Sequence, residues 1–273
     1  SDWNIHSEKN KKSCSREKDT MKTLVTVGRG GTGKTSFVAV MARYFIHRGD
    51  VPILLVDADP DQNLAEMVGV DLEKAGIDTI SDLVTDTFIR KGGTTIGIPP
   101  SERIESRIWK DGLYEGESFD LIAVGTKWIE GCYCMPDAAL KEALSRMTRN
   151  YRYILIDSPA GVEHLNRKIV SRVDDIFDII GASNKSFEHV KRAYRIACEV
   201  GIQFDHFYIV GGNQMPQDFA IPEPEAMQQY LGPIAYDHEV QDAVLRGRSL
   251  LELPENSPMV QSVEELMTKA GYG

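Results

Sequence analysis

Short apolar runs alternate with longer amphipathic stretches along most of the chain. Seven runs have the length of β-strands, and most are continuously apolar, as expected for strands that helices cover on both faces. The predicted strands are residues 23–27, 53–56, 119–124, 153–156, 176–180, 207–210 and a shorter 232–235. Strands that alternate with helical stretches predict βαβ units and an α/β fold built on a mainly parallel sheet.

Helical periodicity fills several of the gaps between these strands. Residues 35–47 place five apolar side chains on one stripe, and residues 137–149 repeat the pattern. Further helices are predicted at 187–200, where Cys198 is expected on the apolar face, and at 259–270. Residues 85–118 are glycine-rich, charged and weakly patterned. They predict long loops with one short helix at 102–109 on the rim of the fold.

Composition limits the domain organisation and the class of protein. Residues 1–20 hold nine charged side chains and almost nothing apolar, which indicates a disordered arm or a remnant foreign to the protein. Residues 21–273 are expected to form one domain. No apolar run has the length of a membrane helix, which predicts a soluble, cytoplasmic chain. The net charge of −10 disfavours nucleic acid and anionic membranes as partners.

The segment between the first strand and the first helix has the pattern of a phosphate-binding loop. Residues 28–35 read G-R-G-G-T-G-K-T and match G-x-x-x-x-G-K-[ST] in the strand–loop–helix context that this motif requires. Glycines let backbone N–H groups face phosphate oxygens, Lys34 reaches the β and γ phosphates, and the Thr35 hydroxyl can ligate Mg²⁺. The residues expected to bind ATP or ADP here are Gly28, Gly30, Gly31, Thr32, Gly33, Lys34, Thr35 and Ser36.

Carboxylates follow two other strands. Asp57 and Asp59 stand at alternate positions after the second strand, where ligands of open α/β sheets bind. A turn rich in Asp and Pro, favoured by its local hydrogen bonding, is the alternative. Asp157 closes an apolar strand, as in a Walker B element whose carboxylate holds Mg²⁺. Gly161 behind it can offer its N–H to the γ phosphate.

The glycine-crowded loop resembles the deviant P-loop G-K-G-G-x-G-K-[ST] of the family that includes the MinD and ParA ATPases and the nitrogenase iron protein. The resemblance implies that Asp57 belongs to the Mg²⁺ shell and that Asp59 orients the attacking water. It also puts an adenine contact on Asn213, where a simple turn asparagine is the alternative. Arg29 stands where the family's lysine crosses a dimer interface, and it is either a trans contact to phosphate or a solvated cation.

Cys132 and Cys134 form a C-x-C pair, which offers two soft ligands where closed zinc or cluster sites need four. A two-fold symmetric dimer completes such a half-site. Two buried cysteines or a vicinal redox pair are the alternatives. The segments 130–134 (E-G-C-Y-C) and 160–165 (A-G-V-E-H-L) are similar to stretches of the CooC-type ATPases, which mature nickel carbon monoxide dehydrogenase.

This second resemblance implies that Cys132 and Cys134 share one metal ion, zinc or nickel, across a homodimer. It implies a nickel-inserting ATPase whose client is carbon monoxide dehydrogenase or a related metalloenzyme, with Lys34, Asp59 and Arg29 as catalytic residues. Two other hypotheses remain at this point. One is a partitioning or positioning ATPase like ParA or MinD, which the acidic charge opposes, and the other is an iron–sulfur reductase component like the nitrogenase iron protein.

Overall fold

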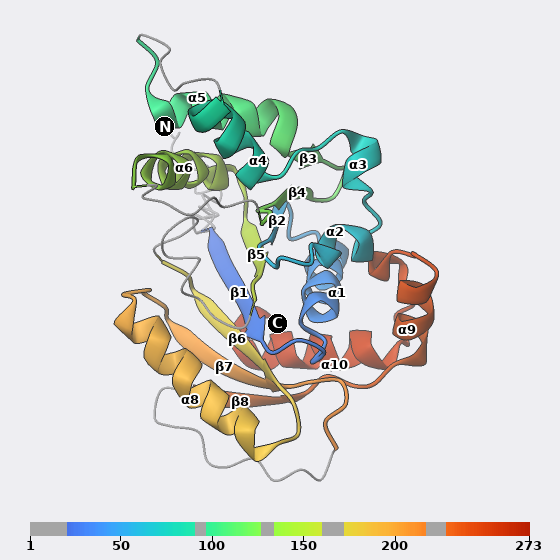
Figure 1. Ribbon diagram of the computed structural model, residues 1–273. Coiled ribbons are helices and arrows are strands. Elements are labelled where there is room, and N and C mark those ends of the chain that lie inside the picture. The colour runs from blue at the N-terminus through green and yellow to red at the C-terminus, as the bar shows by residue number, and fades with distance from the viewer. Residues whose placement is uncertain (1–20, 91–96, 127–133, 160–171, 217–227) are drawn as a thin grey trace, which may run out of the picture.

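The computed structural model describes residues 21–90, 97–126, 134–159, 172–216 and 228–273. One eight-stranded sheet crosses these residues in the order β3-β4-β2-β5-β1-β6-β7-β8 (Figure 1). Neighbouring strands are parallel except for β3 and β4. The strands are β1 (Lys22–Gly28), β2 (Ile53–Asp57), β3 (Tyr114–Glu115), β4 (Asp120–Ala123), β5 (Tyr153–Asp157), β6 (Asp175–Ile180), β7 (His206–Gly211) and β8 (Gln228–Pro233).

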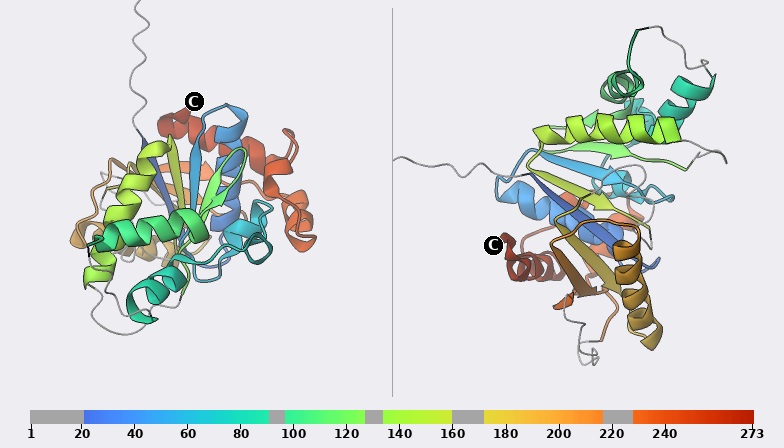
Figure 2. Two further views of the ribbon diagram at one scale, coloured as in Figure 1. Left: turned by 90° about the horizontal axis from the view of Figure 1, so that it is seen from above. Right: turned by 90° about the vertical axis from the view of Figure 1, so that its left-hand side faces the viewer.

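Helices cover both faces of this sheet, as the continuously apolar strands predict (Figures 1 and 2). Apolar side chains of α1 and α10 pack into the core on one face, and those of α5, α6 and α8 pack into the core on the other. The helices are α1 (Lys34–His47), α2 (Asn63–Met67), α3 (Leu72–Ala75), α4 (Ile80–Thr85), α5 (Pro100–Arg107), α6 (Cys134–Met147), α8 (Asn184–Glu199), α9 (His238–Leu245) and α10 (Pro258–Met267).

The predicted parallel α/β sheet is confirmed, and six of the predicted strands lie within one residue of the observed bounds at each end. The last strand was placed too late, because β8 begins at Gln228 and ends at Pro233 with a register irregularity opposite Ile209 and Val210.

The prediction for residues 85–118 is wrong in two respects. The short helix is present as α5, but it does not lie on a rim, since Ile104 and Ile108 are fully buried and belong to the core beside α6. π-helical turns at Asp86–Arg90 and Ile108–Gly112 flank it, so the described part of this segment is mostly helical. Two isoleucines four residues apart place one apolar stripe on an otherwise charged helix.

Cys198 is also not where the periodicity of α8 placed it. Its side chain is exposed, while Ala193 and Ala197 make the buried contact of α8 with the sheet. No helix in the described ranges is long and apolar enough to span a bilayer. Residues 1–20, predicted to be a disordered arm, lie outside the described residues.

Candidate active site

Strand order and register bring three polar side chains into one row at the carboxyl edge of the sheet. β5 lies between β2 and β1, with Asp157 paired in register to Asp57 on one side and to Thr26 on the other. All three are fully buried. The chain turns from β1 into α1 at this same edge, which is where open parallel sheets bind their ligands.

The phosphate loop between β1 and α1 needs its glycines for conformation and for space. Gly31 and Gly33 adopt φ angles of 80° and 93°, in the left-handed region that favours glycine. A Cβ on Gly28 would lie 2.4 Å from the carbonyl oxygen of Ile179 on β6. The Gly33 carbonyl accepts from the N–H of Phe37 at 2.9 Å, which starts α1 directly behind the loop. The loop therefore points the N-terminus of a buried helix toward the sheet edge.

Lys34 forms an ion pair with Asp59 across this edge. The ammonium nitrogen lies 2.9 Å from Asp59 Oδ2, and the two side chains are only 8% and 16% exposed. The other Asp59 oxygen accepts from the backbone N–H of Asp61. Two residues that the sequence placed in one catalytic group, although they are 25 positions apart, are thus in direct contact.

Asp57 anchors the segment that carries Asp59. Its two oxygens accept from the backbone N–H groups of Asp59 at 3.2 Å and Leu64 at 2.9 Å. Burial, followed by the nearby Asp157, raises the pKa of Asp57 to about 7, and the two N–H donors act in the opposite direction. In this structure Asp57 fixes the start of α2, so its predicted contact with Mg²⁺ stays a prediction.

Asp157 differs from Asp57, because neither of its carboxylate oxygens has a partner in hydrogen-bonding geometry. Burial raises its pKa to about 6, against the Thr35 hydroxyl and the charge of Lys34, which both act to lower it. A buried carboxylate with two open oxygens next to a P-loop threonine is a suitable donor set for Mg²⁺, which takes one or two carboxylates and leaves its other positions to phosphates and water. Thr35 and Asp157 thus fit the predicted magnesium site.

Asn213 packs against the phosphate loop from the end of β7. Its side chain lies 3.3 Å from the position of a Cβ built on Gly33, and its Oδ1 is buried without a partner. A buried acceptor without a donor costs roughly 1–3 kcal/mol, so a ligand amino group such as that of adenine would be favoured there.

We expect Asn213→Ala to weaken ATP binding by about tenfold, because the adenine contact that the resemblance implies would give the buried Asn213 Oδ1 the donor that it lacks. The measurement is the Kd for ATP by fluorescence competition. Unchanged binding would mean that Asn213 is a turn residue.

Comparison with known proteins identifies the family. The family model described as "AAA domain" matches residues 22–196. The chain is 30% identical over 251 residues to an uncharacterized ATP-binding protein of Methanocaldococcus jannaschii, covering 90% of this chain and 97% of that one. It is also 30% identical over 244 residues to the carbon monoxide dehydrogenase accessory protein CooC of Rhodospirillum rubrum, covering 85% and 90%.

The chain belongs to the deviant P-loop ATPases of the MinD, ParA and CooC kind. Among solved structures, MinD of Aquifex aeolicus superimposes with a TM-score of 0.63 at 20% identity, covering 92% of this chain and 97% of that one. That likeness shows the shared fold. The family match and the two relatives at 30% identity confirm the predicted P-loop ATPase.

The described structure leaves the roles of several residues predicted for this deviant P-loop site untested. Arg29 is exposed, as both a trans contact and a solvated cation require, and the Ser36 hydroxyl donates to the sulfur of Met67 at 3.7 Å. Gly161 and Cys132 lie outside the described residues, as does the side chain of Cys134, which is the first residue of α6. The described side chains include no group of three or more His, Cys, Asp or Glu suited to hold a metal ion.

Sequence reasoning missed Thr26 at this deviant P-loop site. Its buried hydroxyl has no partner and lies on the strand next to Asp157. The available signal was a polar residue in an otherwise apolar part of the strand, two positions before the phosphate loop begins at Gly28.

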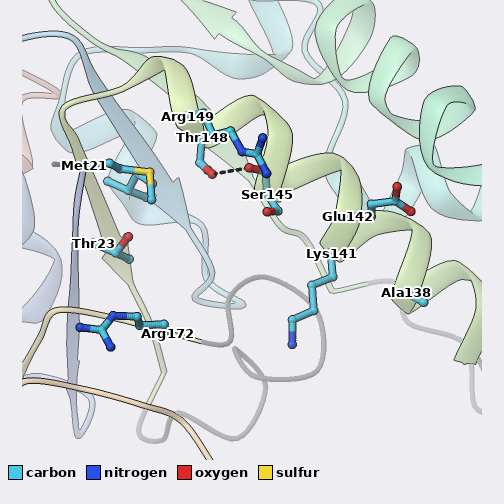
Figure 3. Close-up of a pocket in the computed structure, with 10 residues that line it drawn as sticks. Met21, Thr23, Ala138, Lys141, Glu142, Ser145, Thr148, Arg149 and Arg172 are labelled. Carbon is cyan, nitrogen blue, oxygen red and sulfur yellow. Dashed lines mark hydrogen bonds between the residues drawn. The ribbon is translucent and has the colours of Figure 1, made fainter. Parts of the chain in front are cut away.

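A hollow of about 530 Å³ lies between α6 and the start of β1, at the end of the strands opposite the phosphate loop (Figure 3). Figure 3 shows Lys141, Arg149 and Arg172 reaching in different directions along its wall. Arg172 pairs with Asp205 at 2.8 Å, and Glu142 pairs with Arg146 at 2.7 Å. Because its charges do not converge, this hollow is unsuited to a nucleotide, which the P-loop edge binds.

Proposed function

We propose that this ATPase is a homodimeric maturation factor that couples ATP binding and hydrolysis to nickel insertion into carbon monoxide dehydrogenase or a related metalloenzyme. The observation that carries the proposal is the C-x-C pair in a chain that is 30% identical to CooC. Topology supports it, because Cys134 begins the helix that follows β4, and β4 ends at Ala123 in register with Asp57. The cysteines therefore follow a strand that ends at the carboxyl edge of the sheet, where the phosphate loop also lies.

Each residue of the site has a task in this proposal. Lys34, and Arg29 from either subunit, offset the charge of the β and γ phosphates. Asp59 orients the water that attacks the γ phosphate, and Asp57 keeps Asp59 in place through the N–H groups that it binds. Thr35 and Asp157 would hold Mg²⁺, which neutralises phosphate charge when bound. Cys132 and Cys134 of two subunits bind zinc or nickel as one shared site.

The acidic net charge supports a protein client over DNA or membrane. The net charge is −10, and α10 carries Glu264 and Glu265 without a basic residue. A basic amphipathic C-terminal helix, which a membrane-binding relative would use, is thus not formed by α10.

The test is metal content and mass in solution, with and without ATP, for the wild type and for the double variant Cys132→Ala with Cys134→Ala. The wild type is expected to hold one metal ion per dimer and to dimerise with ATP, whereas the double variant loses the metal. Cys198→Ala is the matched control, because Cys198 is an exposed free cysteine on α8. Metal content and dimerisation that survive in the double variant would show that the pair is structural. Visible absorption by anaerobically purified protein would favour the iron–sulfur hypothesis instead.

A further inference from the structure

A second hollow, of about 320 Å³, lies against the C-terminal half of α1. Its wall comes from α1, from the turn between β3 and β4, and from the helical turn Leu250–Glu252. Arg43 on this wall is nine residues beyond Lys34, which is about 14 Å along a helix. The hollow is therefore separate from the nucleotide edge, and nothing in the proposed ATPase mechanism uses it.

Arg43 is an unusual residue to find on such a wall, because it is only 2% exposed. Its Nε donates to the carbonyl oxygen of Leu253 at 2.9 Å, which is the hydrogen bond that the described residues give this side chain. Burial lowers the pKa of Arg43, although the charges of Glu264 and Glu255 oppose that shift. Neither glutamate is within ion-pair distance in the described structure, so the buried guanidinium is left without a contacting anion.

The rest of the wall restricts what that anion can be. Tyr114, Phe119 and Leu251 make much of it apolar, and the exposed Glu117 stands on the rim with His47 opposite on α1. A guanidinium matches the planar fork of a carboxylate, whereas the rim glutamate repels a doubly charged phosphate. We propose that this hollow binds a carboxylate that has an apolar group beside it, with Arg43 as the anchor. The inference goes beyond the proposed function, and its test needs no nucleotide.

Benzoate and its neutral analogue benzamide are the probes, and binding to the full chain is measured by ligand-observed NMR titration. Benzoate is expected to bind at millimolar concentrations at least tenfold more tightly than benzamide, because only the carboxylate meets Arg43. N-acetylphenylalanine added as a competitor tests the source of the ligand. Tighter binding than benzoate indicates the carboxyl end of a peptide, and weaker binding indicates a small organic acid.

Two variants locate the site. Arg43→Met is expected to remove the preference for benzoate, with the unfolding midpoint measured alongside because the residue is buried. Glu117→Gln, on the exposed rim, is expected to tighten benzoate binding about threefold and to leave benzamide and ATP binding unchanged. If Arg43→Met does not fold, the benzoate affinity of Glu117→Gln relative to the wild type decides whether the hollow is the binding site. Equal affinities of benzoate and benzamide, no binding of either, or an affinity for benzoate that Glu117→Gln leaves unchanged overturns the proposal.

Discussion

Asp59→Asn is expected to slow ATP hydrolysis by at least about 100-fold while ATP binds several-fold more tightly. The carboxylate is assigned to orient the attacking water, and an amide cannot replace that function. The same carboxylate holds Lys34 at 2.9 Å in a largely buried ion pair. ATP must break this pair to reach the lysine, so removing the negative charge favours the phosphate. Single-turnover hydrolysis and a separate Kd for ATP distinguish the two effects.

Asp71→Asn is the matched control for this substitution. Asp71 also pairs with a lysine, Lys74, at 2.7 Å, but both side chains are well exposed, and neither is assigned to the nucleotide site. Neither turnover nor ATP affinity should change in the control. If Asp59→Asn lowers ATP affinity and turnover by the same factor, then Asp59 positions Lys34 for binding and has no separate role toward water.

The free energy of unfolding is expected to fall by on the order of 4 kcal/mol between pH 4 and pH 7 because of Asp178 alone. This carboxyl lies in β6, is fully buried, and has no hydrogen-bond partner on either oxygen. Burial raises its pKa from 3.8 to about 7, a gap of about 3 pH units at about 1.4 kcal/mol each.

The direction follows from proton counting. Between these two pKa values the folded chain keeps the Asp178 proton and the unfolded chain releases it, so rising pH favours unfolding. The stabilising contribution is complete below about pH 4 and is lost as pH rises toward about 7. Asp57 and Asp157, with pKa values raised to about 7 and about 6, act in the same direction.

Asp178→Asn separates this residue from the other two. The variant keeps the shape of the side chain and cannot titrate, so its unfolding free energy should depend less steeply on pH than that of the wild type. Urea unfolding of both proteins at pH 5, 6, 7 and 8 gives the difference in slope, in which Asp57 and Asp157 cancel. Parallel pH profiles would mean that Asp178 is ionised in the folded chain and has a partner.

Local patterns were enough to predict the part of the molecule that binds phosphate. The loop at residues 28–35, its strand and its helix are adjacent in sequence. Glycines mark the loop, a continuous apolar run marks the strand, and helical periodicity marks the helix. Asp57, Asp59 and Asp157 were found for the same reason, since each closes or follows an apolar strand. Their mutual arrangement needed the strand order, because β5 enters between β2 and β1 only in three dimensions.

Short helices and the surroundings of buried polar side chains could not be predicted from the sequence. Helices α3 and α4 have fewer than seven residues, too few for periodicity, although Asp71 and Thr79 cap their first turns with side-chain oxygens. Asp178 was read as one position of an apolar strand, and a pattern cannot show that a carboxyl lacks a partner. Arg43 was likewise invisible, because its contact with Leu253 spans 210 positions.

The burial of α1 has a consequence for how this ATPase changes shape during its cycle. Lys34 and all residues from Ser36 to Phe45 are buried. A helix enclosed in this way opens only when the whole fold opens, so its amides should be among the last to exchange with deuterium. We therefore expect exchange to be slow in α1 and faster in the segment around Asp59, where Gln62 adopts a left-handed conformation before α2.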